Sequence, residues 1–169
     1  MTESAYKAKE WLNRTIDLYD KAEKTAREIK LIESRINKAV MNYESAGSGS
    51  ADPIVRQQQH EDALLEYSEK MAKYDKEYLA FVRQEFITIY VLDSMKNRRA
   101  ANILFMRHIS RYSIKEIAKD GTINLKESQL YNLYKSALEE LAPLLITEEP
   151  KAIKEVEEQI RERQTQATA

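Results

Sequence analysis

Side chains that can hydrogen-bond to the edges of nucleic-acid bases gather between residues 126 and 132. They are Lys126, Ser128, Gln129 and Asn132. Gln and Asn amides can form two hydrogen bonds with adenine, and Lys can donate to a guanine edge or to a phosphate. On a helix, most of these residues fall opposite an apolar stripe. We therefore expect the four side chains to contact base edges in double-stranded DNA.

Four basic residues near this segment are suited to binding phosphates. They are Arg107, Arg111, Lys115 and Lys135. Residues 96–145 carry nine Lys and Arg against five acids, a net charge of +4, although the whole chain carries −1. A basic module joined to an acidic remainder fits a protein with a DNA-contacting part and a part with another task. Spacing alone leaves a second interpretation open, in which these are ordinary polar surface residues of a helical bundle.

Short helices are expected to position these side chains. The first runs from about residue 98 to 109, with Ser94 or Asn97 as its cap. A second begins at a capping box, in which Ser113 and Glu116 each satisfy a free backbone N–H of the other residue. These signals predict two short helices before the polar segment.

The polar segment itself is expected to be the last of three short helices. Gly121 suits the left-handed position that ends the helix before it. The last helix runs from 125 to about 141 in this prediction, capped by Asn124 with Glu127 and stopped by Pro143. Its inward face consists of Leu130, Leu133 or Tyr134, Ala137, Leu138 and Leu141.

Three motifs in this region carry a resemblance to a known family. They are Leu104-x-Met106-Arg107-His108-Ile109, Ser113-x-x-Glu116-Ile117-Ala118 and Ala137-Leu138-x-x-Leu141. They resemble region 4 of bacterial sigma factors, a helix-turn-helix that reads the −35 promoter element and touches the polymerase flap. The resemblance therefore implies DNA and host RNA polymerase as partners. Between Ala118 and Leu130 the chain is about two residues longer than in the usual helix-turn-helix.

From about residue 8 to 145 the chain is also similar to small proteins of gram-positive phages and prophages. Those proteins begin Ala-Lys-Glu-Tyr-Leu, where this chain has Ala8-Lys9-Glu10-Trp11-Leu12. They combine an N-terminal coiled coil with a sigma-region-4-like second part, and they are described as late transcriptional regulators. The similarity implies a regulator that acts in the cytoplasm of a bacterial host cell.

The first half of the chain predicts two long helices. Residues 6–43 contain no Gly or Pro, and their apolar residues recur at steps of three and four. Residues 46–51 break this helix, and Asp52 with Pro53 is suited to start another. A second apolar stripe consists of Leu64, Tyr67, Met71, Tyr74, Tyr78 and Phe81. The pattern predicts a long antiparallel coiled-coil hairpin.

The expected fold is therefore all-α, in three parts. Residues 1–93 form the hairpin, with its loop near 45–53, and residues 94–145 form a sigma-region-4-like three-helix domain with a helix-turn-helix. Residues 146–169 form a short amphipathic helix, from about 147 to 163, and a frayed tail. We expect a homo-oligomer, formed through the coiled coil or through this C-terminal helix.

Composition argues against several other classes of protein. The chain has no Cys and three Gly, which excludes a disulfide, a thiolate nucleophile and a Gly-rich phosphate loop. No apolar run is long enough to cross a membrane, and the N-terminus does not resemble a signal peptide. His60 and His108 are the two histidines, and neither lies near carboxylates at the spacing of metal ligands. We expect no catalytic residues, no metal and no cofactor, and hence no enzyme.

The function expected from the residues and the resemblance is sequence-specific DNA binding in transcription regulation, together with host RNA polymerase. One alternative is a coiled-coil adaptor that binds polymerase or a host factor without sequence-specific DNA binding. Another is an accessory protein of phage DNA packaging or replication.

Overall fold

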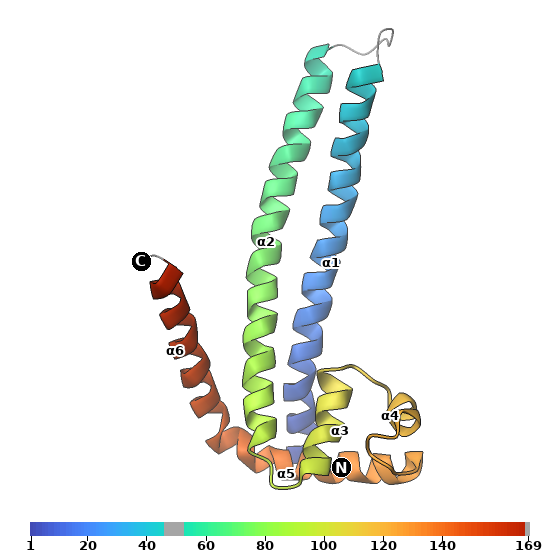
Figure 1. The fold of residues 1–169 in the computed structure, drawn as a ribbon, viewed down its shortest axis with the longest axis vertical. Helices are drawn as coiled ribbons and strands as arrows, with labels where there is room; N and C mark the ends of the chain where they lie inside the picture. Colours follow the sequence, from blue (N-terminus) through green and yellow to red (C-terminus); the bar gives the residue numbers. More distant parts are fainter. Residues whose placement is uncertain (46–52, 168–169) are drawn as a thin grey trace. The chain divides into compact units, whose positions relative to one another are not determined.

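The computed structural model describes residues 1–45 and 53–167, and every regular element in these ranges is a helix (Figure 1). The helices are α1 (Glu3–Ser45), α2 (Pro53–Asp93), α3 (Arg98–His108), α4 (Ile114–Asp120), α5 (Glu127–Thr147) and α6 (Glu149–Ala167). The expected all-α class is confirmed. The predicted break at 46–51 and the cap at Asp52 lie outside the described residues.

The chain packs into two compact units. One contains Leu18–Ala80, and the other contains Met1–Asp17 together with Phe81–Ala169. The segment 1–93 therefore contributes residues to both units. None of the helices in the described ranges combines the length and the apolar character that crossing a bilayer requires.

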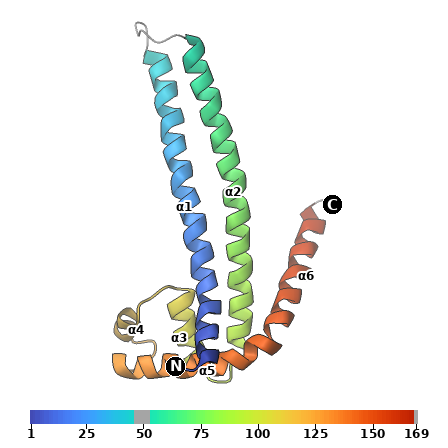
Figure 2. The same ribbon diagram turned by 180° about the vertical axis from the view of Figure 1, so that it is seen from behind.

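In the Leu18–Ala80 unit, α1 and α2 run in opposite directions. Three cross-helix pairs show this: Thr25 with Glu77, Glu28 with Lys70, and Arg35 with Glu66. Residue numbers rise along α1 as those of their partners fall along α2, and the two helices lie side by side within this unit in both ribbon views (Figure 2). Within this unit, α1 supplies the buried apolar side chains Ala22, Ile29 and Ile32.

The inward face of α2 differs from the predicted stripe. Leu64 and Tyr78 were expected to face inward, but they are 46% and 48% exposed, whereas Glu77 is only 8% exposed. The reason is a polar contact, because the Thr25 hydroxyl donates to the Glu77 carboxylate across 2.6 Å. A buried carboxylate needs such partners, since burial without them is costly. The predicted phase of this stripe is therefore wrong at these positions.

Two lysines complete the surroundings of this buried carboxylate. Lys21 Nζ lies 3.9 Å and Lys73 Nζ 3.8 Å from Glu77 Oε1, both with exposed side chains. Because these ammonium groups remain in water, they contribute less than the direct hydrogen bond. The contact from Thr25 thus fixes one alignment of α1 against α2, as buried polar groups do in coiled coils.

We predict that Thr25→Val lowers the free energy of unfolding by about 1–2 kcal/mol, because Glu77 loses a buried hydrogen-bond donor. The double variant Thr25→Val/Glu77→Leu should recover most of this loss, since no buried polar group is then left unpaired. Urea unfolding of the wild type, both single variants and the double variant measures the effect. A double variant less stable than Thr25→Val would contradict this account.

The second unit has one continuous apolar core. Trp11 and Leu12 of α1 belong to it, as do Val91 and Leu92 of α2 and the inner faces of the four remaining helices. Trp11 Nε1 donates to Glu149 across 2.6 Å, which joins the start of α1 to the start of α6. Burial of these side chains stabilises the unit, at roughly 25 cal/mol for each Å² of apolar surface removed from water.

Several predicted helix signals in this unit are confirmed. α3 begins at Arg98 after Asn97, whose side chain accepts from the Ala100 N–H at 3.1 Å. Ser113 and Glu116 form the predicted capping box at the start of α4. Gly121 ends α4 with φ 76°, in the left-handed region that glycine adopts without strain. Local sequence thus sets both ends of the short helix α4.

Two predicted boundaries in α5 are wrong. The helix begins at Glu127 rather than 125, and Asn124 is not its cap. Ile123 is buried and Leu125 is partly buried against the same core, which requires extended chain at the position where the helix was expected to start. Ile123 and Leu125 in the turn before α5 therefore help to fill the core.

Pro143 does not stop α5, which continues to Thr147. Proline removes the hydrogen bond to the carbonyl of residue 139, but Glu139 and Pro143 are both exposed, so water can reach that carbonyl. Leu144 and Leu145 beyond it pack against the core. Their burial offsets the lost hydrogen bond. The tail that was expected to fray from 164 is helical as far as Ala167, where α6 ends, and residues 168–169 lie outside the described residues.

Candidate nucleic-acid interface

α5 presents one buried face and one exposed face. Leu130, Ala137, Leu138 and Leu141 are fully buried, as predicted, and both α3 and α4 pack against this helix. Leu133 and Tyr134 are partly buried beside them. Because burial fixes the rotation of the helix about its axis, the opposite residues are held towards solvent.

The four candidates for base contacts all lie at the exposed N-terminal part of α5. Lys126 is the N-cap residue, and Ser128, Gln129 and Asn132 follow within the first two turns. Ser128, Asn132 and the phosphate candidate Lys135 succeed one another at steps of four and three, so they share one line along the helix. The helix thus brings these three predicted site residues together on one exposed face.

Gln129 has a structural role that the sequence did not indicate. Its Oε1 accepts from the Lys126 backbone N–H at 3.0 Å, which satisfies one of the free donors at the start of the helix. Reading adenine with two hydrogen bonds requires the amide oxygen as well as the amide N–H. The cap uses one of the two lone pairs of this oxygen and restrains the side chain, so Gln129 is less free to present both amide groups to a base. Asn132 has no such local task and is the better candidate for two-bond recognition.

The four phosphate candidates divide into two pairs. Lys115 on α4 and Lys135 on α5 are exposed, whereas Arg107 and Arg111 are half-buried. Arg107 Nη1 donates to the Tyr112 carbonyl oxygen at 3.4 Å, so this side chain helps to hold the loop before α4. Arg111 has φ 63°, a left-handed conformation that costs a non-glycine residue about 1 kcal/mol or more. Of the four candidates, the two lysines are therefore the more exposed.

Acidic residues limit the extent of this surface. Glu139 is exposed on α5, one turn beyond Lys135, and Glu116 is exposed on α4. Hydrogen bonds from Ser113 hold the pKa of the Glu116 carboxyl below its usual value, so it is ionised at neutral pH. Both carboxylates would repel phosphate. Lys115 and Lys135 therefore each have an exposed carboxylate within about one turn of the same helix.

Glu140 fixes α5 at its middle, and sequence reasoning missed this contact. Its Oε1 accepts from the backbone N–H groups of Lys96 and Asn97, each at 3.0 Å. These N–H groups belong to the segment between α2 and α3, where no helix partner is available to them. One feature of the sequence could have indicated this contact: Glu140 is an acidic residue that falls beside Ala137 and Leu141, on the predicted inward side of the last helix.

His108 and Tyr134 join α3 to α5. His108 Nε2 and Tyr134 Oη form a 2.9 Å hydrogen bond, and the two rings are stacked with centroids 5.9 Å apart. Burial, with smaller effects from Arg107 and Lys9, lowers the pKa of His108 from 6.5 to about 4. The imidazole is therefore neutral at neutral pH and packs as part of the core.

The lowered pKa of His108 predicts pH-dependent stability. Between pH 6.5 and about 4 the unfolded chain binds a proton that the folded chain excludes. Stability from this group is complete above pH 6.5 and falls as the pH drops, by about 2 kcal/mol between pH 7 and 5. Denaturant unfolding across this range measures the slope.

His108→Gln should remove most of that slope, whatever its effect on absolute stability. His60→Gln is the matched control, because it removes the other histidine from the Leu18–Ala80 unit, and the slope should persist. A slope unchanged in His108→Gln would contradict the assignment.

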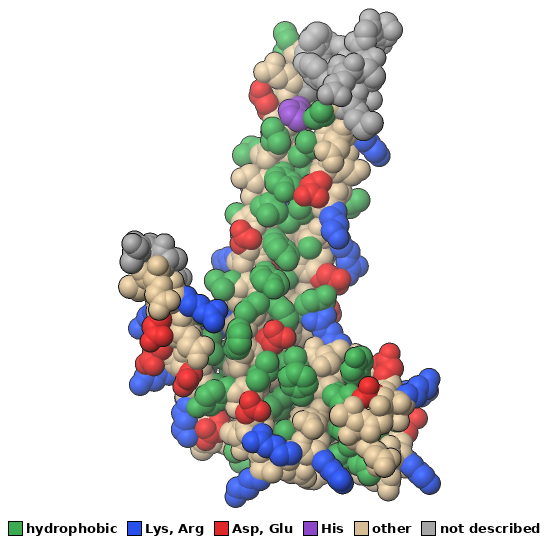
Figure 3. Space-filling view, in the orientation of Figure 1, with side chains coloured by type: hydrophobic (Ala, Val, Ile, Leu, Met, Phe, Trp, Pro, Cys, Tyr) green, Lys and Arg blue, Asp and Glu red, His purple; other side chains and the backbone are tan. Residues whose placement is uncertain are grey.

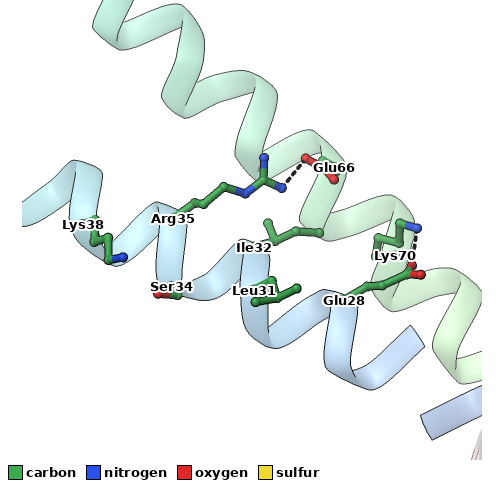
Figure 4. A pocket seen from close by; sticks show the side chains of 8 residues that line it. All are labelled: Glu28, Leu31, Ile32, Ser34, Arg35, Lys38, Glu66 and Lys70. Atoms are coloured by element: carbon green, nitrogen blue, oxygen red, sulfur yellow. Dashed lines mark hydrogen bonds and ion pairs between the residues drawn. The ribbon is translucent and has the colours of Figure 1, made fainter. Parts of the chain in front are cut away.

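The described residues contain no group of three or more His, Cys, Asp and Glu side chains placed to hold a metal ion. An open groove of about 470 Å³ lies between α1 and α2 within the Leu18–Ala80 unit (Figure 4). Its charged side chains pair with one another, with Arg35 bound to Glu66 and Lys70 bound to Glu28. A polar ligand would have to break these pairs, which makes the groove a poor small-molecule site.

Comparison of the chain with models of protein families, with curated proteins and with solved structures gives no match.

Proposed function

We propose that this protein is a phage-type, sequence-specific DNA-binding transcription regulator that acts with host RNA polymerase. In this proposal α4 and α5 form a helix-turn-helix, and the N-terminal half of α5 enters the major groove. The observation that carries it is the exposed line of Ser128, Asn132 and Lys135 on a helix whose other face packs against the core. The resemblance of residues 104–141 to sigma region 4 supports the same assignment.

The fixed position of α5 favours recognition. Three separate contacts hold the helix: its buried leucines, the bond between Tyr134 and His108, and the bonds from Glu140 to the segment before α3. A helix that is already in place loses little conformational freedom when it binds. The base-contacting side chains can then be positioned by the backbone rather than by the DNA.

The proposal also assigns an arrangement and a task to the long helices α1 and α2. We take α1 and α2 as an antiparallel coiled-coil hairpin that provides the surface for polymerase or for a second copy of the chain. The module 96–145 has a net charge of +4, which is modest for tight binding by one copy. A second DNA-binding module, or attachment to polymerase, would supply the remaining affinity.

The first experiment is duplex binding by the full chain, after selection of a preferred sequence from random duplexes. Fluorescence anisotropy should show affinity that falls steeply with salt. Lys135→Glu should weaken binding to all duplexes by about tenfold and reduce the salt slope by about one, because one phosphate contact is lost. Lys30→Glu makes the same charge change at an exposed position in the Leu18–Ala80 unit and should have little effect. Equal losses in the two variants would contradict the proposed face.

Specificity is tested at Asn132 and Gln129. Asn132→Ala should cost about 1–3 kcal/mol on the selected duplex and little on unrelated duplexes, because base contacts carry the discrimination. Gln129→Glu keeps the oxygen that caps Lys126 but removes the amide donor, so it should reduce specificity without loss of stability. Gln129→Ala should also lower the free energy of unfolding by about 1 kcal/mol. No duplex binding at low salt by a folded chain would refute the DNA assignment.

A second candidate function is a protein-interaction adaptor without sequence-specific DNA binding. Exposed apolar side chains in the Leu18–Ala80 unit favour it, among them Leu31 at 68% and Leu65 at 62% exposure. Under this hypothesis Asn132→Ala has no effect on activity, whereas apolar-to-charged changes in this unit abolish it.

A further inference from the structure

α2 has a second apolar face, on the side turned away from α1. Its contacts with α1 come from Tyr67, Lys70 and Glu77, whereas Leu65 and Leu79 fall on the opposite side of the helix. Leu65 is 62% and Leu79 55% exposed. Figure 3 shows hydrophobic side chains exposed along the helices of the Leu18–Ala80 unit. A large apolar side chain that is exposed alone is ordinary, but a repeated row along one helix indicates an interface.

The spacing of this row matches a coiled-coil seam. Leu65, Ala72 and Leu79 recur every seven residues, and Ser68 lies between the first two. Leu64 is 46% exposed and widens the row on one edge. Two large leucines thus flank two small side chains, a pattern in which the large side chains of one helix can fit over the small ones of another.

The other edge of the row carries an acidic residue followed by a basic one. Glu69 comes first and Lys76 follows seven residues later, so both lie on the same edge of the helix. Both side chains are exposed. Neither forms an ion pair with any part of the chain that the structure describes. When two copies of this helix lie antiparallel, the acid on the edge of one copy lies opposite the base on the same edge of the other. The edge is therefore complementary in charge to itself.

We propose that this face of α2 binds the same face of a second copy of the chain, with the two helices antiparallel. Residues of one edge meet their own counterparts only in an antiparallel pair, so Glu69 faces Lys76 of the second copy, and Lys76 faces its Glu69. Leu79 then packs over Ser68 and Ala72 of the second copy. The contact is self-complementary, as a two-fold dimer requires.

Asp75 is the charged residue within this seam. It lies close to the proposed two-fold axis, beside Ala72 of the second copy, where the two copies bring their carboxylates towards each other. Such a residue weakens the pair and selects one alignment. The proposal therefore includes a gain of affinity: Asp75→Asn should tighten the dimer severalfold.

This proposal deepens the proposed function by naming the face that would bind a second copy of the chain, but its test involves neither DNA nor α5, so either proposal can fail without the other. Sedimentation velocity of the full chain, from low micromolar to near-millimolar concentration, should show a reversible monomer–dimer equilibrium. Leu79→Glu should raise the dimer dissociation constant at least about tenfold, because it places a carboxylate in an apolar seam. Leu31→Glu changes an exposed leucine of α1, at 68% exposure against 55% for Leu79, and should leave the constant unchanged. Circular dichroism confirms folding of each variant.

Charge reversal tests the direction of the pair. Glu69→Lys and Lys76→Glu should each weaken the dimer severalfold, and the double variant should recover the wild-type affinity, since the two pairs are then restored with exchanged signs. A chain that remains monomeric at every concentration overturns the proposal, whatever other protein this face binds. A dimer insensitive to Leu79→Glu, or a double variant as weak as the singles, overturns it too.

Discussion

Burial of one side of α5 is the interaction on which the rest of the candidate site depends. Leu130, Leu138 and Leu141 are fully removed from water, so rotating the helix would expose them at a cost of roughly 2 kcal/mol each. The same constraint determines which side chains of α5 remain in solvent. Ser128, Asn132 and Lys135 are therefore exposed because the apolar side chains on the opposite face of the helix are buried.

Polar contacts add precision that apolar packing lacks. Apolar contacts alone would allow α5 to shift along its neighbours. In the unit that contains α5, the hydrogen bonds of Glu140 and of the pair His108 and Tyr134 oppose such a shift. In the Leu18–Ala80 unit, the buried bond from Thr25 to Glu77 has the same effect on the alignment of two long helices. Each such contact satisfies groups that would otherwise be buried without partners, so moving the helices would be penalised.

The sequence predicted local structure well because the signals were local. The capping residues at Asn97, Ser113 and Gly121 act within one helical turn, and the structure has them in the expected roles. It failed where tertiary packing decided the outcome. Burial of Ile123 delayed the start of α5, solvent access allowed the helix to continue through Pro143, and the partner on α1 turned Glu77 inward.

The candidate site follows the same division. Exposure of Lys126, Ser128, Gln129 and Asn132 agrees with the predicted outer face, because the period of an apolar stripe is visible in the sequence. The cap formed by Gln129 and the partial burial of Arg107 and Arg111 were not visible, since they depend on how the turns before α4 and α5 fold.

The most direct measurement is amide chemical-shift mapping by NMR while the full chain is titrated with a selected duplex. We expect the largest chemical-shift changes on residues 126–135 and smaller ones around Lys115, while α6 and the Leu18–Ala80 unit change little. Changes concentrated on α6 or in the Leu18–Ala80 unit, or none at all at low salt, would contradict this expectation.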